Sequence, residues 1–155
     1  MKRMMILFAA LSATPAAAQQ IERHPTTPPG PILGAVTVPP GATTLHISGQ
    51  VPAAVTPGDF GDTKAQTLSV LGKIRAILAA RGMTMADLVK LNVYLVGDPK
   101  LGGNMDFAGM NAGYREVFGT AENPNLVART TVQISALANP AFLVEIDAVA
   151  ARVGR

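Results

Sequence analysis

The hydrophobic period of this chain changes several times along its length, and this change limits its possible folds more than any other feature. Near the C-terminus, apolar and polar side chains alternate over 130–137 and over 142–150, which predicts two β-strands that a short turn joins into a hairpin. Apolar residues recur instead at helical spacing over 60–82 and 105–119. A chain that combines both periods in this way predicts an α+β domain.

Three further strands complete the predicted element order. Residues 34–38 and 43–49 are predicted strands around a Pro-Pro-Gly turn, and 87–98 is a predicted strand between the two helices. The order is then β-β-α-β-α-β-β. We expect the two helices to pack on one face of a mixed sheet, because each helix must bury its apolar side against another element.

The ends of the helices can also be predicted. Asp62 or Thr63 would cap the first helix, and Gly82 would stop it, since glycine adopts the left-handed conformation that follows many helices. In the second helix Tyr114 lies at helical spacing from Phe118, so we expect its ring in the core.

One charge in each C-terminal strand is out of place for a buried sheet. Arg129 begins the first of these strands and Glu145 lies in the middle of the second, although Arg and Glu are seldom fully buried unless they are paired or bound. On the sheet face away from the helices we expect Thr131, Gln133, Glu145 and Asn92. Such a polar face with few charges suggests burial against other subunits around a wet pocket, so we expect a homo-oligomer.

The first residues have the pattern of an export signal. Lys2 and Arg3 form a basic start, 4–13 is a short apolar stretch, and 16–18 is a small-residue cleavage site. We therefore expect residues 1–18 to be a signal peptide that is removed after Ala18. The apolar stretch is too short to remain as a membrane anchor, so the mature protein would be periplasmic or secreted.

Removal of the signal peptide would leave one domain behind a short lead-in. Residues 19–31 are rich in proline, and we expect them to be extended and mobile, while 32–155 forms a single domain. The leader contains two of the 13 basic residues and none of the 10 acidic ones, so the formal charge falls from +3 to +1. With this charge and no basic run, we expect no nucleic-acid partner.

Composition excludes chemistry based on sulfur. The chain has no cysteine, so it forms no disulfide and has neither a thiolate nucleophile nor a Cys-ligated metal. Its two histidines, His24 and His46, are well separated in the sequence, and we predict no metal site from them. We expect His46 on a strand face and assign no role to His24.

Five segments in a fixed order carry a family resemblance: ISGQVP, DLVKLNVYLVGD, MNAGYREVF, ARTTVQISAL and LVEIDAVA. Through them the chain resembles, over about residues 30–152, the Rid/YjgF family of reactive-intermediate deaminases. This resemblance implies a chorismate-mutase-like fold and a homotrimer whose sheets face inward, with pockets between the subunits. It also implies hydrolysis of 2-aminoacrylate and related imines to 2-keto acids and ammonia, without a metal or an organic cofactor.

The resemblance gives roles to the two unusual charges. Arg129 matches the carboxylate-binding arginine of the family, and its planar fork suits the carboxylate of a 2-imino acid. Glu145 matches an acidic residue of the family, and a carboxylate that is partly shielded from water can move protons for an attacking water if its pKa is raised. Asp147, on the same strand face, is a rival for this role. The structural alternative for Arg129 is an ion pair at the start of its strand or at a subunit interface. For Glu145 it is a salt bridge across the interface, with Arg129 as one candidate partner.

Four further residues are assigned to substrate binding. Asn111 matches a family asparagine near the pocket, although a hydrogen bond on the helix surface explains it equally well. Gly49 would let the backbone approach a ligand, or would serve as a plain turn. Thr131 stands where the family has a pocket cysteine, and Ile32 where it has a tyrosine that closes the pocket. These two differences from the family pattern would change which substrate the pocket prefers.

Three functions remain open from the sequence. The first is an exported imine deaminase in which Arg129 holds the carboxylate and Glu145 activates the water. The second is a non-catalytic trimeric binding protein for small carboxylates such as 2-keto acids, because an exported protein would rarely meet imines that are made in the cytoplasm. The third is a chaperone-like or protein-interaction role.

Overall fold

The computed structural model describes residues 20–154; the predicted signal peptide, 1–18, lies outside them. The strands are β1 (Glu22–Pro25), β2 (Leu33–Thr37), β3 (Thr43–Gln50), β4 (Leu88–Val96), β5 (Ala128–Ile134) and β6 (Val144–Arg152). The helices are α1 (Thr63–Ala79) and α2 (Phe107–Arg115), with short 3-10 turns at η1 (Met85–Asp87) and η2 (Pro99–Leu101). Within the described residues, no helix has the length and apolarity needed to cross a bilayer.

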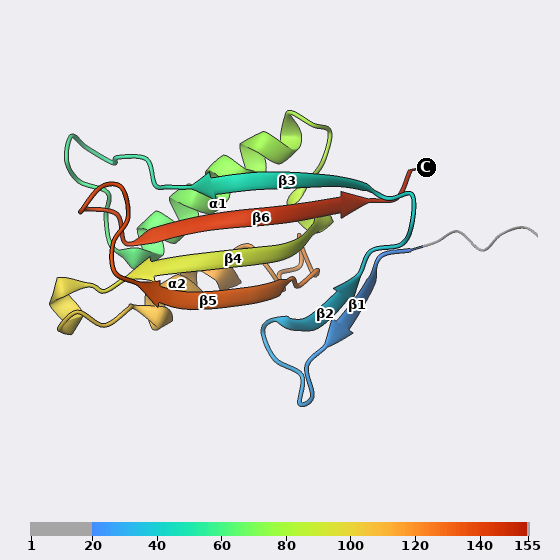
Figure 1. Cartoon of the computed structure of the whole chain (residues 1–155), viewed down its shortest axis with the longest axis horizontal. Coiled ribbons are helices and arrows are strands. Elements are labelled where there is room, and N and C mark those ends of the chain that lie inside the picture. The colour runs from blue at the N-terminus through green and yellow to red at the C-terminus, as the bar shows by residue number, and fades with distance from the viewer. Residues whose placement is uncertain (1–19, 155) are drawn as a thin grey trace, which may run out of the picture.

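The six strands form one mixed sheet in the order β1-β2-β5-β4-β6-β3. Strand β4 lies parallel to β5 and antiparallel to β6, and β3 completes one edge antiparallel to β6. Both helices cover the same face, behind the sheet in the view of Figure 1, and leave the other face open. The predicted fold class, two helices on one face of a mixed sheet, is therefore confirmed.

The predicted C-terminal hairpin is wrong. Strands β5 and β6 are both present, but β4 lies between them and pairs with each. The loop of residues 135–143 crosses about 10 Å, two strand spacings, to pass β4. Gln66 of α1 holds this loop, since its Oε1 accepts from the Leu143 N–H at 2.7 Å and its Nε2 donates to the Ala141 carbonyl at 3.0 Å. Alternation predicted the strands but carries no information about their partners.

The face assigned to two residues of β5 is also wrong. Residues that pair across neighbouring strands point to the same face, and the register pairs Arg129, Thr131 and Gln133 with Leu91, Val93 and Leu95 of the buried face. Thr131 and Gln133 therefore lie on the helix side. They keep polar side chains there because β5 lies beside the core, where Gln133 accepts from the Met105 N–H and donates to the Gly103 carbonyl, each at 2.9 Å.

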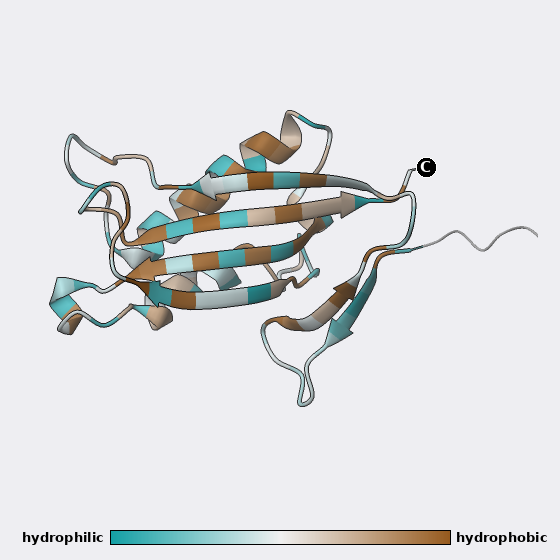
Figure 2. Ribbon diagram, in the orientation of Figure 1, coloured by the Kyte–Doolittle hydropathy of each residue, from teal (hydrophilic) through white to brown (hydrophobic). Residues whose placement is uncertain are grey.

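The open face carries the other predicted polar residues. Glu145 pairs with Tyr94, and Asp147 pairs with Asn92, at positions that alternate with the buried residues of β4 and β6. The same alternation is visible as changing colour along these two strands in Figure 2. Asn92 and Glu145 thus occupy the face predicted for them.

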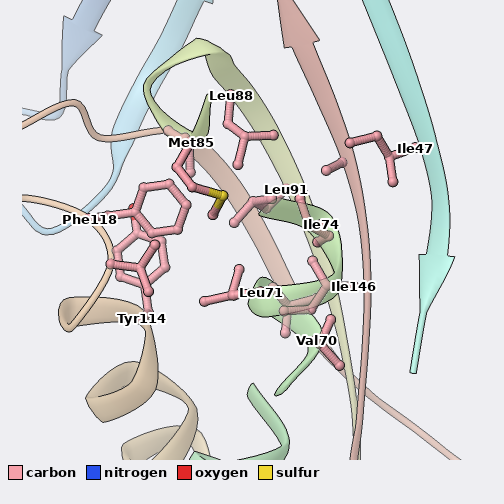
Figure 3. Packing of buried hydrophobic residues seen from close by; sticks show 14 of the residues in the cluster. Ile47, Val70, Leu71, Ile74, Met85, Leu88, Leu91, Tyr114, Phe118 and Ile146 are labelled. Carbon is pink, nitrogen blue, oxygen red and sulfur yellow. The ribbon is translucent and has the colours of Figure 1, made fainter. Parts of the chain in front are cut away.

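The core lies between the helices and the sheet. In Figure 3, Leu71 and Ile74 of α1 and Tyr114 of α2 point toward Leu91 and Ile146 of the sheet. The ring of Tyr114 is 2% exposed and stacks on Phe118 with the ring centroids 4.6 Å apart, so the predicted core position is confirmed.

The predicted ends of α1 are confirmed. The side chain of Asp62 accepts from the Ala65 N–H at 2.8 Å, and Gly82 lies just beyond the helix with a φ of 67°. Asp62 and not Thr63 is the N-cap, since Thr63 is the first residue of α1.

The proline-rich lead-in contains a strand that was not predicted. β1 pairs antiparallel with β2. The guanidinium of Arg23 donates to the Leu126 carbonyl at 2.6 Å and to the Ala86 carbonyl at 2.8 Å, which ties β1 to the body of the domain. Burial lowers the pKa of Arg23, and the negative charge of Asp87 opposes this effect.

Candidate functional site

The first part of the candidate site surrounds Arg129 on the helix side of β5. Its Nη2 donates to the Oδ1 of Asn111 at 2.8 Å, and its Nη1 lies 3.6 Å from the sulfur of Met110. The guanidinium also lies 4.5 Å from the ring centroid of Tyr114 and 5.8 Å from that of Phe107. These α2 residues hold the guanidinium in one place, which is what a carboxylate clamp requires.

The positive charge of Arg129 has no anionic partner within residues 20–154. Burial lowers the pKa of Arg129, an effect that Tyr114 opposes, yet an arginine remains charged at neutral pH. A half-buried cation with unused N–H groups gains free energy from an anion that can approach it. Within the described residues Arg129 therefore forms no ion pair, so the alternative of an ion pair inside the chain is not supported.

Thr131 lies two residues along β5, on the same face as Arg129. Its hydroxyl oxygen is buried and has no hydrogen-bond partner in the described part of the chain. Buried hydroxyl groups nearly always find a partner, because an unpaired one costs free energy. We name the pair of Arg129 and Asn111, together with Thr131 on the same face of β5, the clamp.

The second part of the candidate site lies on the open face, where Glu145 of β6 meets Gly49 of β3. A side chain at position 49 would overlap the carboxyl group of Glu145, because a Cβ built on Gly49 lies 1.9 Å from its Oε1 and 2.8 Å from its Cδ. Gly49 therefore leaves room for the Glu145 carboxyl group in this position, and any larger residue would force that side chain to turn away. Within residues 20–154, Glu145 has neither a hydrogen-bond donor nor an ion-pair partner for its carboxylate.

Asp147, the rival carboxylate, is already engaged. It accepts from the Nδ2 of Asn92 at 2.8 Å and from the hydroxyl of Tyr94 at 3.0 Å. The hydrogen bond to Asp147 also raises the pKa of Tyr94. Of the two acidic residues on this face of β6, Glu145 is the one that is free to meet a substrate or a water.

Ile32 lies close to the clamp. It packs against the core just before Leu33, whose N–H donates to the Val127 carbonyl at 3.0 Å and which pairs with Ala128. In this parallel register Ile32 lies opposite Val127, beside the start of β5 and two residues before Arg129. His46 is exposed on β3, as predicted for a strand-face residue.

A family model described as Endoribonuclease L-PSP matches residues 35–152. The chain belongs to this family, which is also known as the YjgF/Rid family. A RutC family protein of Pyrococcus horikoshii is 40% identical over 108 residues, which cover 68% of this chain and 77% of the relative. The 2-iminobutanoate/2-iminopropanoate deaminase of Escherichia coli K12 is 36% identical over 106 residues, with the same coverage of 68% and 77%.

Solved structures of the YjgF/Rid family have the same fold. A Rid family protein from Yersinia pestis matches with a TM-score of 0.60 and 33% identity, over 77% of this chain and 85% of its own. The YjgF gene product from E. coli matches with a TM-score of 0.57 and 33% identity, over 74% of this chain and 84% of its own. The YjgF-like fold predicted from the sequence is confirmed.

Arg129 and Glu145 of this Rid-family chain do not share one pocket within a single subunit. They lie on opposite faces of the sheet. Their strands flank β4, about 10 Å apart, and their partners on β4 are three residues apart, about 10 Å along the strand. The structure therefore contains two half-sites: the clamp, and the Gly49–Glu145 pair.

Sequence reasoning missed one residue at the clamp. Phe107 lies one helical turn before Asn111, on the same side of α2, and its ring faces Arg129. The signal that could have identified it is the i, i+4 spacing from Asn111. The helical spacing of Phe107 from Met110, Tyr114 and Phe118 predicts a place in the core stripe of this helix, yet Phe107 is 44% exposed.

Proposed function

We propose that this protein hydrolyses reactive 2-imino acids and their enamine forms to 2-keto acids and ammonia. The observation that supports this most directly is the clamp, in which a half-buried and uncompensated Arg129 is held by Asn111. A 2-imino acid carries a carboxylate next to its electrophilic carbon, so a clamp on the carboxylate positions that carbon. A relative with 36% identity is a 2-iminobutanoate/2-iminopropanoate deaminase.

The reaction needs one group that moves protons. Water adds to the carbon of the protonated imine and gives a proton to the Glu145 carboxylate, which forms a neutral carbinolamine. Glu145 then returns this proton to the nitrogen, the C–N bond breaks, and the leaving ammonia carries away the hydroxyl proton as ammonium. The sum is iminium and water to keto acid and ammonium, with Glu145 unchanged. Glu145 suits this role because Asp147 is already occupied.

We also propose that a second copy of the chain completes the site. The clamp and Glu145 lie on opposite faces of one sheet, too far apart to hold a single small substrate. A homotrimer, as the sequence resemblance implies, would bring the clamp of one subunit to the Gly49–Glu145 pair of its neighbour. Repetition around a threefold axis would give three identical sites.

The site of action that we propose is the periplasm or the exterior of the cell. This proposal depends on the basic start and the apolar stretch of residues 1–18. In that compartment the substrates would be imines that form outside the cytoplasm, for example by oxidation of free amino acids.

The test is the decay of imines that an amino-acid oxidase generates in situ, followed with the purified mature protein. We expect faster decay with the wild type, and a loss of at least about 100-fold in kcat/KM for Arg129→Ala and for Glu145→Gln. Arg75→Ala, which removes an exposed arginine of α1, is the matched control and should keep full activity. Full activity of Arg129→Ala would remove the clamp from the mechanism.

A non-catalytic binding protein for small carboxylates is the second candidate. It is favoured by one observation, that the clamp is complete within a single chain while Glu145 lies on the other face. A chain that did not assemble would keep the carboxylate clamp without its proton-transfer group. Calorimetric titration with 2-keto acids that shows binding through Arg129, with no turnover of any imine, would establish this function instead.

A further inference from the structure

A groove continues from the clamp along the N-terminal half of α2. Its volume is about 650 Å³, and it lies between α2 and the η2 turn. Its apolar walls are Leu101, Met105, Phe107 and Ala108, and its polar residues include Asn111 and Arg115. Small-molecule sites usually have this size and this mainly apolar lining.

The groove begins at the clamp itself. Asn111 lines it and also accepts the hydrogen bond from Arg129, while Phe107 lines it one turn earlier and places its ring 5.8 Å from the same guanidinium. A molecule whose carboxylate is held by Arg129 would therefore find the groove next to its α-carbon. Because the groove lies next to the α-carbon of such a molecule, it is a suitable site for the substrate side chain.

The walls of the groove expose apolar surface to water. Leu101 is 47% exposed and Phe107 is 44% exposed, and they are two of the four most exposed large apolar side chains among residues 20–154. Exposed apolar surface of this kind gains free energy when an apolar ligand covers it. Leu101 comes from η2 and Phe107 from α2, and both line the groove, so one ligand side chain bound there can contact both.

The groove is preformed, because hydrogen bonds hold both of its walls. Gln133 of β5 accepts from the Met105 N–H at 2.9 Å and donates to the Gly103 carbonyl at 2.9 Å, which fixes the segment between η2 and α2. Asp106 accepts from the Gly109 N–H at 2.8 Å and so caps α2. A preformed apolar site loses little entropy on binding.

We propose that this groove holds the side chain of the substrate, so that the protein selects 2-imino acids with bulky apolar side chains. Imines derived from leucine, methionine or phenylalanine would fit the groove, whereas the imine derived from alanine would leave it empty. This inference rests on the proposed function. Because one methylene in an apolar pocket is worth about 10-fold or more in kcat/KM, we expect at least about a 10-fold preference for the leucine-derived imine over the alanine-derived one.

The test measures the ratio of kcat/KM for the leucine-derived and the alanine-derived imine, each generated by an amino-acid oxidase. In Leu101→Ala, which removes part of one wall, we expect this ratio to fall several-fold. In Ala108→Phe, which fills the groove from an exposed position, we expect it to fall at least about 10-fold. Val55→Ala is the matched control: Val55 is 70% exposed and lies outside the groove, so the ratio should not change.

Two results separate this inference from the proposed function. If the wild type hydrolyses the alanine-derived imine as fast as the leucine-derived one, the groove does not select the substrate, although the deaminase function stands. No acceleration for any imine would overturn both. The exposed apolar walls could instead be covered by a second copy of the chain. A change of oligomeric mass in Leu101→Ala or Ala108→Phe, seen by light scattering with an unchanged ratio, would overturn the inference in favour of a subunit contact.

Discussion

At the scale of single residues, the site depends on polar groups that lack either a partner of opposite charge or a hydrogen-bond partner within the described residues. The carboxylate of Glu145 occupies space that a side chain at position 49 would take, and the guanidinium of Arg129 lacks an anion within the described residues. The hydroxyl of Thr131 is buried without a partner. Within the described residues Arg129 and Glu145 lack a partner of opposite charge and Thr131 lacks a hydrogen-bond partner, and a polar substrate or a second subunit could supply each of them.

Gly49→Ala tests the contact between Gly49 and Glu145. The added Cβ would overlap the carboxyl group of Glu145, so this side chain must turn away. We expect kcat to fall at least about 10-fold while the fold remains, because the flexible carboxylate can move at small cost. Gly72→Ala is the control: an added Cβ there meets nothing within 4 Å on α1, and we expect it to raise the free energy of unfolding by up to about 1 kcal/mol.

Thr131→Val tests whether the hydroxyl of Thr131 serves the substrate. Valine keeps the shape and removes a buried hydroxyl that has no partner, so the free energy of unfolding should stay equal or rise by about 1 kcal/mol. If the hydroxyl donates a hydrogen bond to the bound carboxylate, KM should rise several-fold at the same time. Denaturant unfolding and steady-state kinetics measure the two effects. A loss of stability together with an unchanged KM would show that the hydroxyl serves the fold.

At the scale of elements, strands and helices were predictable and their partners were not. Local periodicity identified α1, α2, β4 and the two C-terminal strands, since buried positions repeat with the period of each element. It could not place β4 between β5 and β6, because a hydrophobic pattern does not specify which strands pair. Without the strand partners, the polar side chains of Thr131 and Gln133 were assigned to the open face, which is the wrong one.

The site was predictable only as a set of residues. The resemblance selected Arg129, Asn111 and Glu145, and the structure brings the first two together at 2.8 Å. The structure places Glu145 on the opposite face of the sheet. This separation could not be predicted, because it depends on the strand order, which the sequence pattern does not contain. Phe107 was missed because an aromatic residue at helical spacing is more often part of the core.

The contact between η1 and the end of β6 makes stability depend on pH. Burial alone would raise the pKa of the Asp87 carboxyl, but hydrogen bonds from Arg152 and Thr84 outweigh burial and hold this pKa below its usual range. A carboxyl whose pKa is lower in the folded than in the unfolded state stabilises the fold above its unfolded pKa, near 4. This stability is lost as the pH falls through the folded pKa.

Asp87→Asn should therefore show a weaker acid dependence than the wild type. Denaturant unfolding between about pH 2 and pH 6 would measure it, because this range spans the pKa of an unfolded Asp. We expect the free energy of unfolding of the wild type to decrease more steeply below about pH 4 than that of Asp87→Asn. Equal slopes for the two proteins would mean that the pair of Asp87 and Arg152 does not carry the pH dependence.

At the scale of the whole molecule, the two half-sites give a reason to assemble. The helices cover one face of the sheet, and the open face presents Glu145 beside an occupied network of Asp147, Asn92 and Tyr94. The clamp lies at the other side of the sheet, near β5. We therefore propose that catalysis takes place between subunits, with Arg129 from one and Glu145 from its neighbour.

Mixed assembly of two inactive variants tests this claim most directly. Arg129→Ala and Glu145→Gln are each purified, unfolded, mixed in equal amounts and refolded together, and the decay of an oxidase-generated imine is then measured. In a randomly mixed trimer a site has an intact Arg129 and an intact Glu145 in about one case in four, so about a quarter of the wild-type activity should return. If both residues act within one chain, no mixed assembly contains an intact site. Activity that stays at the level of the separate variants, in trimers shown by mass to contain both chains, would contradict the account.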